Sequence, residues 1–279
     1  HHHVLVRSAA HRVLRIDELR IRLHEFVAVR GHARSHADIG EGLRLRIHGV
    51  RLRAHGEVAS LRGRTVDSVT AIGTNLVVRF DDKRSLIVHL GMSGRLWLTD
   101  NAAAVAAPDH FDLVLENGRV VRLRDPRRFG LVVWQDRNAP EHPLLASIGP
   151  EPLSPAFSGK WLHEVTRKRS AAIKLVLMDS RVVAGIGNIY ASEALFRARI
   201  NPRLAARRIG PGRYDVLADK VRETLEAAIQ AGGSTLRDYV GGDGRAGYFQ
   251  NEHLVYGRGG EPCVACATPI REIRQGQRS

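Results

Sequence analysis

Two short motifs place residues with distinctive chemistry on glycine-flanked turns. Residues 89–94 read His-Leu-Gly-Met-Ser-Gly, and residues 125–130 read Asp-Pro-Arg-Arg-Phe-Gly. Met92 is a flexible apolar wedge, while Arg127 beside Phe129 pairs a hydrogen-bonding fork with a stacking ring. A protein that pushes a base out of a duplex needs such groups to fill the vacated stack and to satisfy the orphaned partner base. Either motif alone is more often a core methionine or a surface turn, but together they favour nucleic-acid chemistry.

Two further motifs are typical of metal and phosphate binding. Cys263 and Cys266, the only two cysteines, form half of a four-thiolate zinc ribbon. A second pair is expected after about 15–20 residues, and the sequence stops at Ser279, so either a C-terminal segment is missing or the finger is broken. Residues 185–188 read Gly-Ile-Gly-Asn before a helical stretch, which resembles a phosphate-binding turn, although this pattern alone is more often a plain tight turn.

The elements that must position these motifs change from strands to helices along the chain. Short runs rich in β-branched and aliphatic residues follow residue 60 and indicate an antiparallel sandwich or barrel. Residues 138–158 contain five prolines and predict a linker that neither a helix nor a central strand would tolerate. The second half has helical spacing. The expected strands are 65–69, 76–80, 86–90, 96–98, 111–115, 120–123 and 131–134, and the expected helices are 161–178, 192–198 and 211–231.

The overall charge is strongly basic. The chain has 43 Lys+Arg against 29 Asp+Glu, a net charge of +14, and a pI near 10.8. Such a balance usually indicates a polyanionic partner, most often nucleic acid, although an arginine-rich proteome gives the same signal. No run approaches the roughly 18 apolar residues of a membrane span, and the start lacks the apolar core of a signal peptide. We therefore expect a cytoplasmic protein with no membrane partner.

Composition changes sharply near residue 58. Residues 1–57 hold nine of the 14 histidines and 11 arginines, while all five lysines lie beyond them. This segment is either a basic, partly ordered arm or a GC-rich gene read out of frame that joins the true frame near Val58. The second interpretation is favoured because local and global signals disagree before this point and agree after it.

Five motifs in order resemble formamidopyrimidine-DNA glycosylase and its relative endonuclease VIII. They are HLGMSGR, DPRRFG, VVAGIGNIYASEALFRA, the run from GGSTLRDYV through GYFQNE and VYGR to GEPC, and the closing QGQRS, and they cover roughly residues 60–279. The resemblance implies an α+β protein that clamps duplex DNA. Its expected parts are an antiparallel β-sandwich domain at 58–137, a linker at 138–158, a helix–two-turn–helix domain at 159–250 and a partial zinc ribbon at 251–279, with 1–57 an atypical segment.

The resemblance also assigns roles to individual positions. Residues that fill the gap left by the everted lesion would be Met92, Arg127 and Phe129. Residues that contact phosphates around the lesion would be His89, Lys174, Asn188, Tyr256 and Arg278. Cys263 and Cys266 match the first pair of zinc ligands, and the loop 234–249 matches the segment that closes over the flipped base.

The chain departs from the family pattern where catalysis begins. In the family, the secondary amine of an N-terminal proline attacks C1′ of the damaged nucleotide to form a Schiff base, and a following glutamate handles protons. This sequence begins His1-His2-His3, and its only Pro-Glu pairs are Pro140-Glu141 and Pro150-Glu151. Thr74 stands where the family has a phosphate-side lysine. No catalytic residue is therefore assigned.

Three hypotheses remain for function. The first is a base-excision glycosylase with AP lyase activity on oxidised purines such as 8-oxoguanine and formamidopyrimidines. The second is a catalytically inactive remnant that binds damaged DNA, and the third is a pseudogene product with an unstable fold. The expected partner in the first two is double-stranded DNA with oxidised or abasic sites, bound by a monomer.

Overall fold

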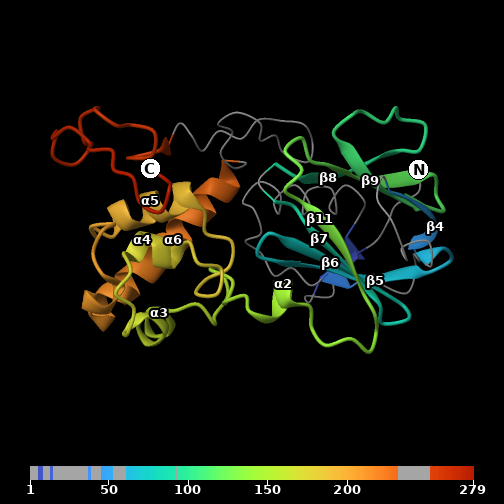
Figure 1. Cartoon of the computed structure of the whole chain (residues 1–279), viewed down its shortest axis with the longest axis horizontal. Coiled ribbons are helices and arrows are strands. Elements are labelled where there is room, and N and C mark those ends of the chain that lie inside the picture. Colours follow the sequence, from blue (N-terminus) through green and yellow to red (C-terminus); the bar gives the residue numbers. More distant parts are fainter. Residues whose placement is uncertain are drawn as a thin grey trace.

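The computed structural model describes residues 61–91, 93–231 and 252–279, and the backbone of four strands before them. The described elements form a strand-rich part and a helical part that lie side by side, with the C-terminal tail over the helices (Figure 1). Within the described residues, no helix is both long and apolar enough to cross a bilayer. The early strands are β1 (Val6–Ser8), β2 (Val13–Leu14), β3 (Ala37–Asp38) and β4 (Leu45–Leu52).

Antiparallel strands form the first part, in agreement with the expected sandwich. The main path is β11-β7-β6-β5-β4-β9-β10-β8. All seven strands expected from sequence are present, and their ends lie within one or two residues of the predicted ends, except that β5 extends three residues further. They are β5 (Thr65–Ile72), β6 (Asn75–Phe80), β7 (Ser85–His89), β8 (Arg95–Asp100), β9 (Asp109–Leu115), β10 (Arg119–Arg124) and β11 (Leu131–Gln135).

Strand β4 joins two sheets. It pairs with β5 at Leu45 and Arg46 and with β9 from Ile47 to Leu52, so strand pairing continues on the N-terminal side of residue 58. Apolar side chains from both sheets meet in one core, including Leu76 and Phe80 of β6 and Phe111 of β9, all 3% exposed or less. This face-to-face packing is what makes the strands a sandwich.

The helical part contains the short turns that a continuous helix would not allow. The expected helix 161–178 is wrong: α3 (Gly159–Thr166) ends before a turn, and α4 (Ile173–Leu177) begins anew. The backbone N–H of Ile173 donates to Leu204 and that of Ala206 donates to Ala171, so tertiary pairing replaces helical bonds there. The remaining helices are α5 (Asn188–Arg197), the 3-10 turn η2 (Ala206–Arg208) and α6 (Pro211–Gln230), and α5 begins four residues earlier than expected.

The proline-rich segment holds a one-turn helix, α2 (Pro143–Ala146), contrary to the expectation that no helix would form there. Pro143 occupies the first helical position, where its missing N–H costs nothing, and the His142 side chain caps the turn. Leu145 of α2 packs against Val77 and Ile87 on the outer face of the sheet. Helix α2 therefore lies between the two parts and helps to fix their relative position (Figure 1).

Candidate nucleic-acid interface

The two motif turns pack against each other at one edge of the sandwich. The Ser93 hydroxyl donates to Asp125 Oδ1 at 2.6 Å, and the Gly130 N–H donates to Asp125 Oδ2, also at 2.6 Å. Gly91 has φ +57°, and a Cβ there would lie 2.6 Å from the Phe129 carbonyl carbon, so only glycine fits. Buried Asp125 thus ties the first turn to the second.

Arg127 and Phe129 project from this joint into solvent. The Arg127 guanidinium lies over the Phe129 ring, 5.2 Å from its centroid. Phe129 is 56% exposed, which is unusual for a large aromatic side chain. Met92 lies outside the described residues, but Gly91 and Ser93 on either side of it both contact the second turn. The Arg127 guanidinium and the Phe129 ring therefore form one exposed unit.

A cleft of about 330 Å³ separates the two parts of the molecule. The sandwich contributes the β5–β6 turn and the end of β7, and the helical part contributes the loop before α5. The buried carboxylate of Glu151 accepts a 2.6 Å hydrogen bond from the Gly73 N–H and so joins the linker to the β5–β6 turn. The cleft is lined by Gly73, Thr74, Asn75, His89, Pro143, Leu144, Ser147, Ile148, Met178, Ser180, Gly185, Ile186 and Gly187.

His89 lines the cleft at the end of β7. Its Nδ1 lies 2.9 Å from Asn75 Oδ1 and 3.3 Å from Thr74 Oγ1. Burial lowers the pKa of His89, and the nearby Asp125 carboxylate partly opposes that shift. Burial thus favours the neutral ring in the free protein, and binding of an anion next to it would favour its charged form.

The opposite wall is the start of α5. Gly187 is the N-cap residue, and Asn188 is the first residue of the helix. Gly185 has φ +68°, and a Cβ at Gly187 would meet no atom of the described residues within 4 Å. Backbone N–H groups and the partial positive charge of a helix N-terminus therefore border open space in the cleft, which suits an anion.

Tyr256 is held next to α5 by a buried carboxylate. Glu193 is fully buried and accepts hydrogen bonds from the N–H groups of Leu254, Val255 and Tyr256, at 2.8–3.0 Å. The Tyr256 hydroxyl lies 3.5 Å from Asn188 Nδ2. Two residues assigned to the phosphate-contacting set thus meet, although they are 68 positions apart.

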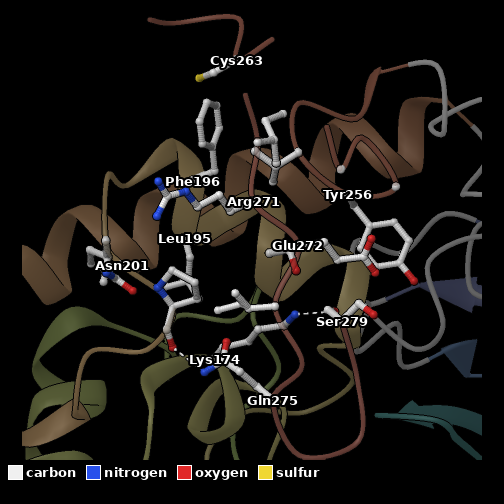
Figure 2. A pocket seen from close by; sticks show the side chains of 18 of the residues that line it. Lys174, Leu195, Phe196, Asn201, Tyr256, Cys263, Arg271, Glu272, Gln275 and Ser279 are labelled. Atoms are coloured by element: carbon white, nitrogen blue, oxygen red, sulfur yellow. Dashed lines mark hydrogen bonds between the residues drawn. The ribbon is translucent and has the colours of Figure 1, made fainter. Parts of the chain in front are cut away.

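Lys174 lies on a second cavity, of about 640 Å³, between α5 and the C-terminal tail (Figure 2). Its Nζ donates to the Ser279 carbonyl oxygen at 2.6 Å, and burial lowers the pKa of Lys174. Arg278 is exposed on the tight turn 275–278, which two backbone hydrogen bonds between Gln275 and Arg278 close. Lys174 and Tyr256 share this cavity, whereas His89 lines the other one.

The two cysteines lie on a turn of the tail. Ala267 N donates to the Cys263 carbonyl at 2.9 Å, and Ala265 N lies 3.4 Å from Cys263 Sγ. The described residues contain no group of three or more His, Cys, Asp and Glu side chains that could hold a metal ion. Two thiolates are half of a closed structural zinc site, so the described residues do not complete one.

Sequence reasoning missed three buried acids, which support the interface without lining the cleft, and Asn75, which lines it. Asp125, Glu151 and Glu193 are each at most 2% exposed. A carboxylate inside an apolar helical run, as in Ala191-Ser-Glu-Ala-Leu195, is a usable signal for a buried anchor, because such groups must be satisfied by hydrogen bonds. Asn75 gives no comparable signal.

These features define a two-domain protein, a β-sandwich and a helix–two-turn–helix domain, with a cleft between them whose walls suit an anion. The N-terminal domain model of formamidopyrimidine-DNA glycosylase matches residues 24–132, and its H2TH domain model matches residues 148–240. The chain belongs to the formamidopyrimidine-DNA glycosylase family. The first match begins earlier than residue 60, where the sequence motifs alone began.

Individual relatives agree with this assignment. The formamidopyrimidine-DNA glycosylase of Janthinobacterium sp. (strain Marseille) is 51% identical over 223 residues, which is 79% of this chain and 81% of the relative. That of Aromatoleum aromaticum is 57% identical over 195 residues, 70% and 72% of the two chains.

Solved structures are also similar. The MutM (Fpg) protein of Thermus thermophilus has a TM-score of 0.75 at 36% identity, covering 85% of this chain and 89% of that one. Lactococcus lactis Fpg in complex with DNA containing an abasic site has a TM-score of 0.74 at 28% identity, covering 93% and 94%.

Proposed function

We propose that this chain is a base-excision DNA glycosylase that recognises oxidised purines in duplex DNA, together with an AP lyase activity. The observation that carries the proposal is the joint at Asp125, which presents Arg127 and Phe129 as one exposed unit at the edge of the sandwich. A guanidinium that can bond an orphaned base, next to a ring that can stack, suits a duplex from which one base has been everted. Met92 is proposed to fill the same gap.

The cleft and the surface near it would hold the DNA backbone. His89 on one wall and the start of α5 on the other would grip phosphates next to the everted nucleotide. Asn188 and Tyr256, which lie together, and the cations Lys174 and Arg278 are proposed as further phosphate contacts. Because the net charge is +14, affinity should fall steeply with salt.

A second candidate function is recognition of damaged DNA without cleavage. Residues 1–57 contain no Pro-Glu pair, so the family's proline nucleophile has no counterpart there. Lys174 is buried and engaged with Ser279, which makes it a poor substitute nucleophile in this arrangement. Binding without cleavage is therefore the alternative to the lyase activity.

Borohydride trapping separates the two candidates. The full chain is incubated with a duplex carrying one 8-oxoguanine, an abasic-site duplex and an intact duplex, with gel shifts run in parallel. A covalent adduct on damaged DNA supports the lyase, and a selective gel shift with no adduct supports binding alone. Equal affinity for damaged and intact duplexes would overturn both.

Zinc, oligomeric state and location complete the proposal. The family's zinc finger is represented here by Cys263 and Cys266, which would supply two thiolate ligands and a structural rather than a catalytic ion. Atomic absorption on purified protein tests this: one zinc per chain supports a site completed by further ligands, and a ratio near zero refutes it. We also expect a cytoplasmic monomer, which light scattering and cell fractionation would check.

A further inference from the structure

The Asn75 side chain is fixed in one orientation beside His89. Asn75 is 3% exposed, and its Nδ2 donates to the Ile72 carbonyl oxygen at 3.1 Å. Rotating the amide by half a turn would place Oδ1 against that carbonyl, and two acceptors would then repel each other. The amide oxygen must therefore point at His89, whose Nδ1 lies 2.9 Å away.

An amide oxygen can only accept a hydrogen bond, so it determines which nitrogen of His89 carries the proton. Nδ1 must be the donor, with Thr74 Oγ1 at 3.3 Å as a weaker second partner. In a neutral imidazole the other nitrogen, Nε2, is then an acceptor. Among the described residues, the two side chains that hydrogen-bond to the His89 ring, Asn75 and Thr74, both contact Nδ1. The ring itself lines the cleft.

We propose that Asn75 is a positioning residue that keeps the proton of neutral His89 on Nδ1, so that Nε2 binds a DNA phosphate only after the ring takes up a second proton. This inference rests on the proposed function, because it assigns DNA as the anion in the cleft. A bare Nε2 would repel a phosphate oxygen, whereas a protonated one donates a charge-assisted bond. DNA binding at this cleft is therefore coupled to uptake of one proton.

Among the described residues, the charged group that acts against this neutrality is Asp125. Asp125, in the turn before β11, favours the protonated ring, but its carboxylate already accepts from Ser93 and Gly130. The neighbours at the start of β6, Thr74 and Asn75, are uncharged. The other described cleft-lining residues, from the β5–β6 turn, α2 and its flanks, and the loop before α5, carry no titratable side chain.

The replacement of the family's lysine by Thr74 gives this device a physical rationale. A lysine in the cleft would supply permanent positive charge, whereas Thr74 leaves His89 as the only titratable side chain among the described lining residues. The cleft then becomes positively charged only when a phosphate binds and His89 takes up its second proton. The free protein thus avoids the desolvation cost of a buried cation. In the complex, the cation forms where a phosphate can pair with it.

Nitrogen-15 NMR of the full, DNA-free chain tests the proton position directly. Spectra are recorded above the pKa of His89, and its signals are assigned by comparison with His89→Gln. The expected result is a protonated Nδ1 and a bare Nε2. A proton on Nε2 would overturn the proposal, and because no DNA is present, that outcome is independent of damaged-DNA recognition.

Affinity for an abasic-site duplex as a function of pH tests the coupling. Between the pKa values of His89 in the free and bound protein, wild-type affinity should fall up to about tenfold per pH unit as pH rises. His89→Gln should lose that dependence, while the control His163→Gln, on α3, should keep it. If His89→Gln and the wild type have the same slope, the proton uptake is refuted, even if both bind damaged DNA selectively.

Two Asn75 variants distinguish a role of Asn75 in positioning the His89 proton from a purely structural role. Asn75→Leu removes the acceptor, so both neutral tautomers become populated, Nε2–H can donate without a second proton, and the slope becomes shallower. Asn75→Asp keeps an acceptor and adds charge, so the pKa of His89 rises and the pH window moves upward. An unchanged window in Asn75→Asp would overturn the proposal, including when Asn75→Leu fails to fold.

Discussion

The carboxylate of Glu193 accepts a hydrogen bond from the backbone N–H of Tyr256 at 2.8 Å, and so links α5 to the C-terminal tail. The same buried group accepts from Leu254 and Val255. Glu193→Ala would leave three N–H groups without this partner, and we expect a loss of about 3 kcal/mol or more in the free energy of unfolding. Urea denaturation measures it.

Glu193→Gln provides the matched comparison. Its amide retains one acceptor oxygen, so the loss should be clearly smaller than in Glu193→Ala. Equal losses in the two variants, or a loss below about 1 kcal/mol in the alanine variant, would show that this anchor does not stabilise the tail. Tyr256, which is already partly exposed, should be modified faster in the alanine variant than in the wild type or the glutamine variant.

Arg127→Ala should reduce the preference for damaged over intact duplex more than it reduces overall affinity. The guanidinium is positioned over Phe129, where it can reach an orphaned base, so its loss matters chiefly once a base has been everted. We expect discrimination to fall by roughly tenfold, equivalent to one good polar contact. Gel shifts on paired 8-oxoguanine and intact duplexes measure the ratio.

Arg128→Ala is the control for that substitution. It removes the same charge from the adjacent exposed position, so it should weaken binding to both duplexes alike. If Arg127→Ala also weakens both duplexes equally, the lesion-specific role of Arg127 is wrong.

Gly187→Ala should weaken DNA binding while leaving the fold intact. The backbone at Gly187 is extended, and a Cβ would meet no atom within 4 Å in the part of the chain that the structure describes, so the change in stability should stay below about 1 kcal/mol. The new methyl group would occupy the space next to the start of α5 where we propose that a phosphate binds. Thermal unfolding and a DNA titration are measured together, with Gly212→Ala on α6 as a control that also meets open space. Unchanged affinity in Gly187→Ala would argue against a phosphate at this turn.

Asp179 should contribute to stability at neutral pH and lose that contribution in acid. Hydrogen bonds from Arg181 and then Arg169 lower the pKa of this carboxyl group from 3.8 to about 2. Because the folded-state pKa is depressed, the stabilisation is fully present above 3.8 and disappears as pH falls through about 2. Relative to Asp179→Asn, the wild type should therefore gain on the order of 1–2 kcal/mol above that range. Urea unfolding of both proteins across this pH range tests the prediction. A difference in unfolding free energy that does not change with pH would contradict the lowered pKa of Asp179.

The sequence by itself determined the strands, the extent of α6 and the chemistry of the two motif turns. Runs of β-branched and aliphatic residues such as those at β6 and β7 are sufficient, because these strands bury side chains on both faces of the sheet. The same reasoning failed at residues 167–172, where helical propensity continues but backbone groups pair with the segment around Leu204 and Ala206. A local pattern cannot anticipate a partner that lies more than thirty residues away.

Only the tertiary structure decided which motif residues meet. It brings Ser93 to Asp125, Asn75 to His89 and Glu193 to Tyr256, and it separates the cavity of His89 from that of Lys174. These contacts depend on strand register, on the packing of α2 against the sheet and on buried acids that must find donors. The residue types in the sequence indicated which chemistry was available. Packing decided which of these side chains lie close together, and so which groups surround His89.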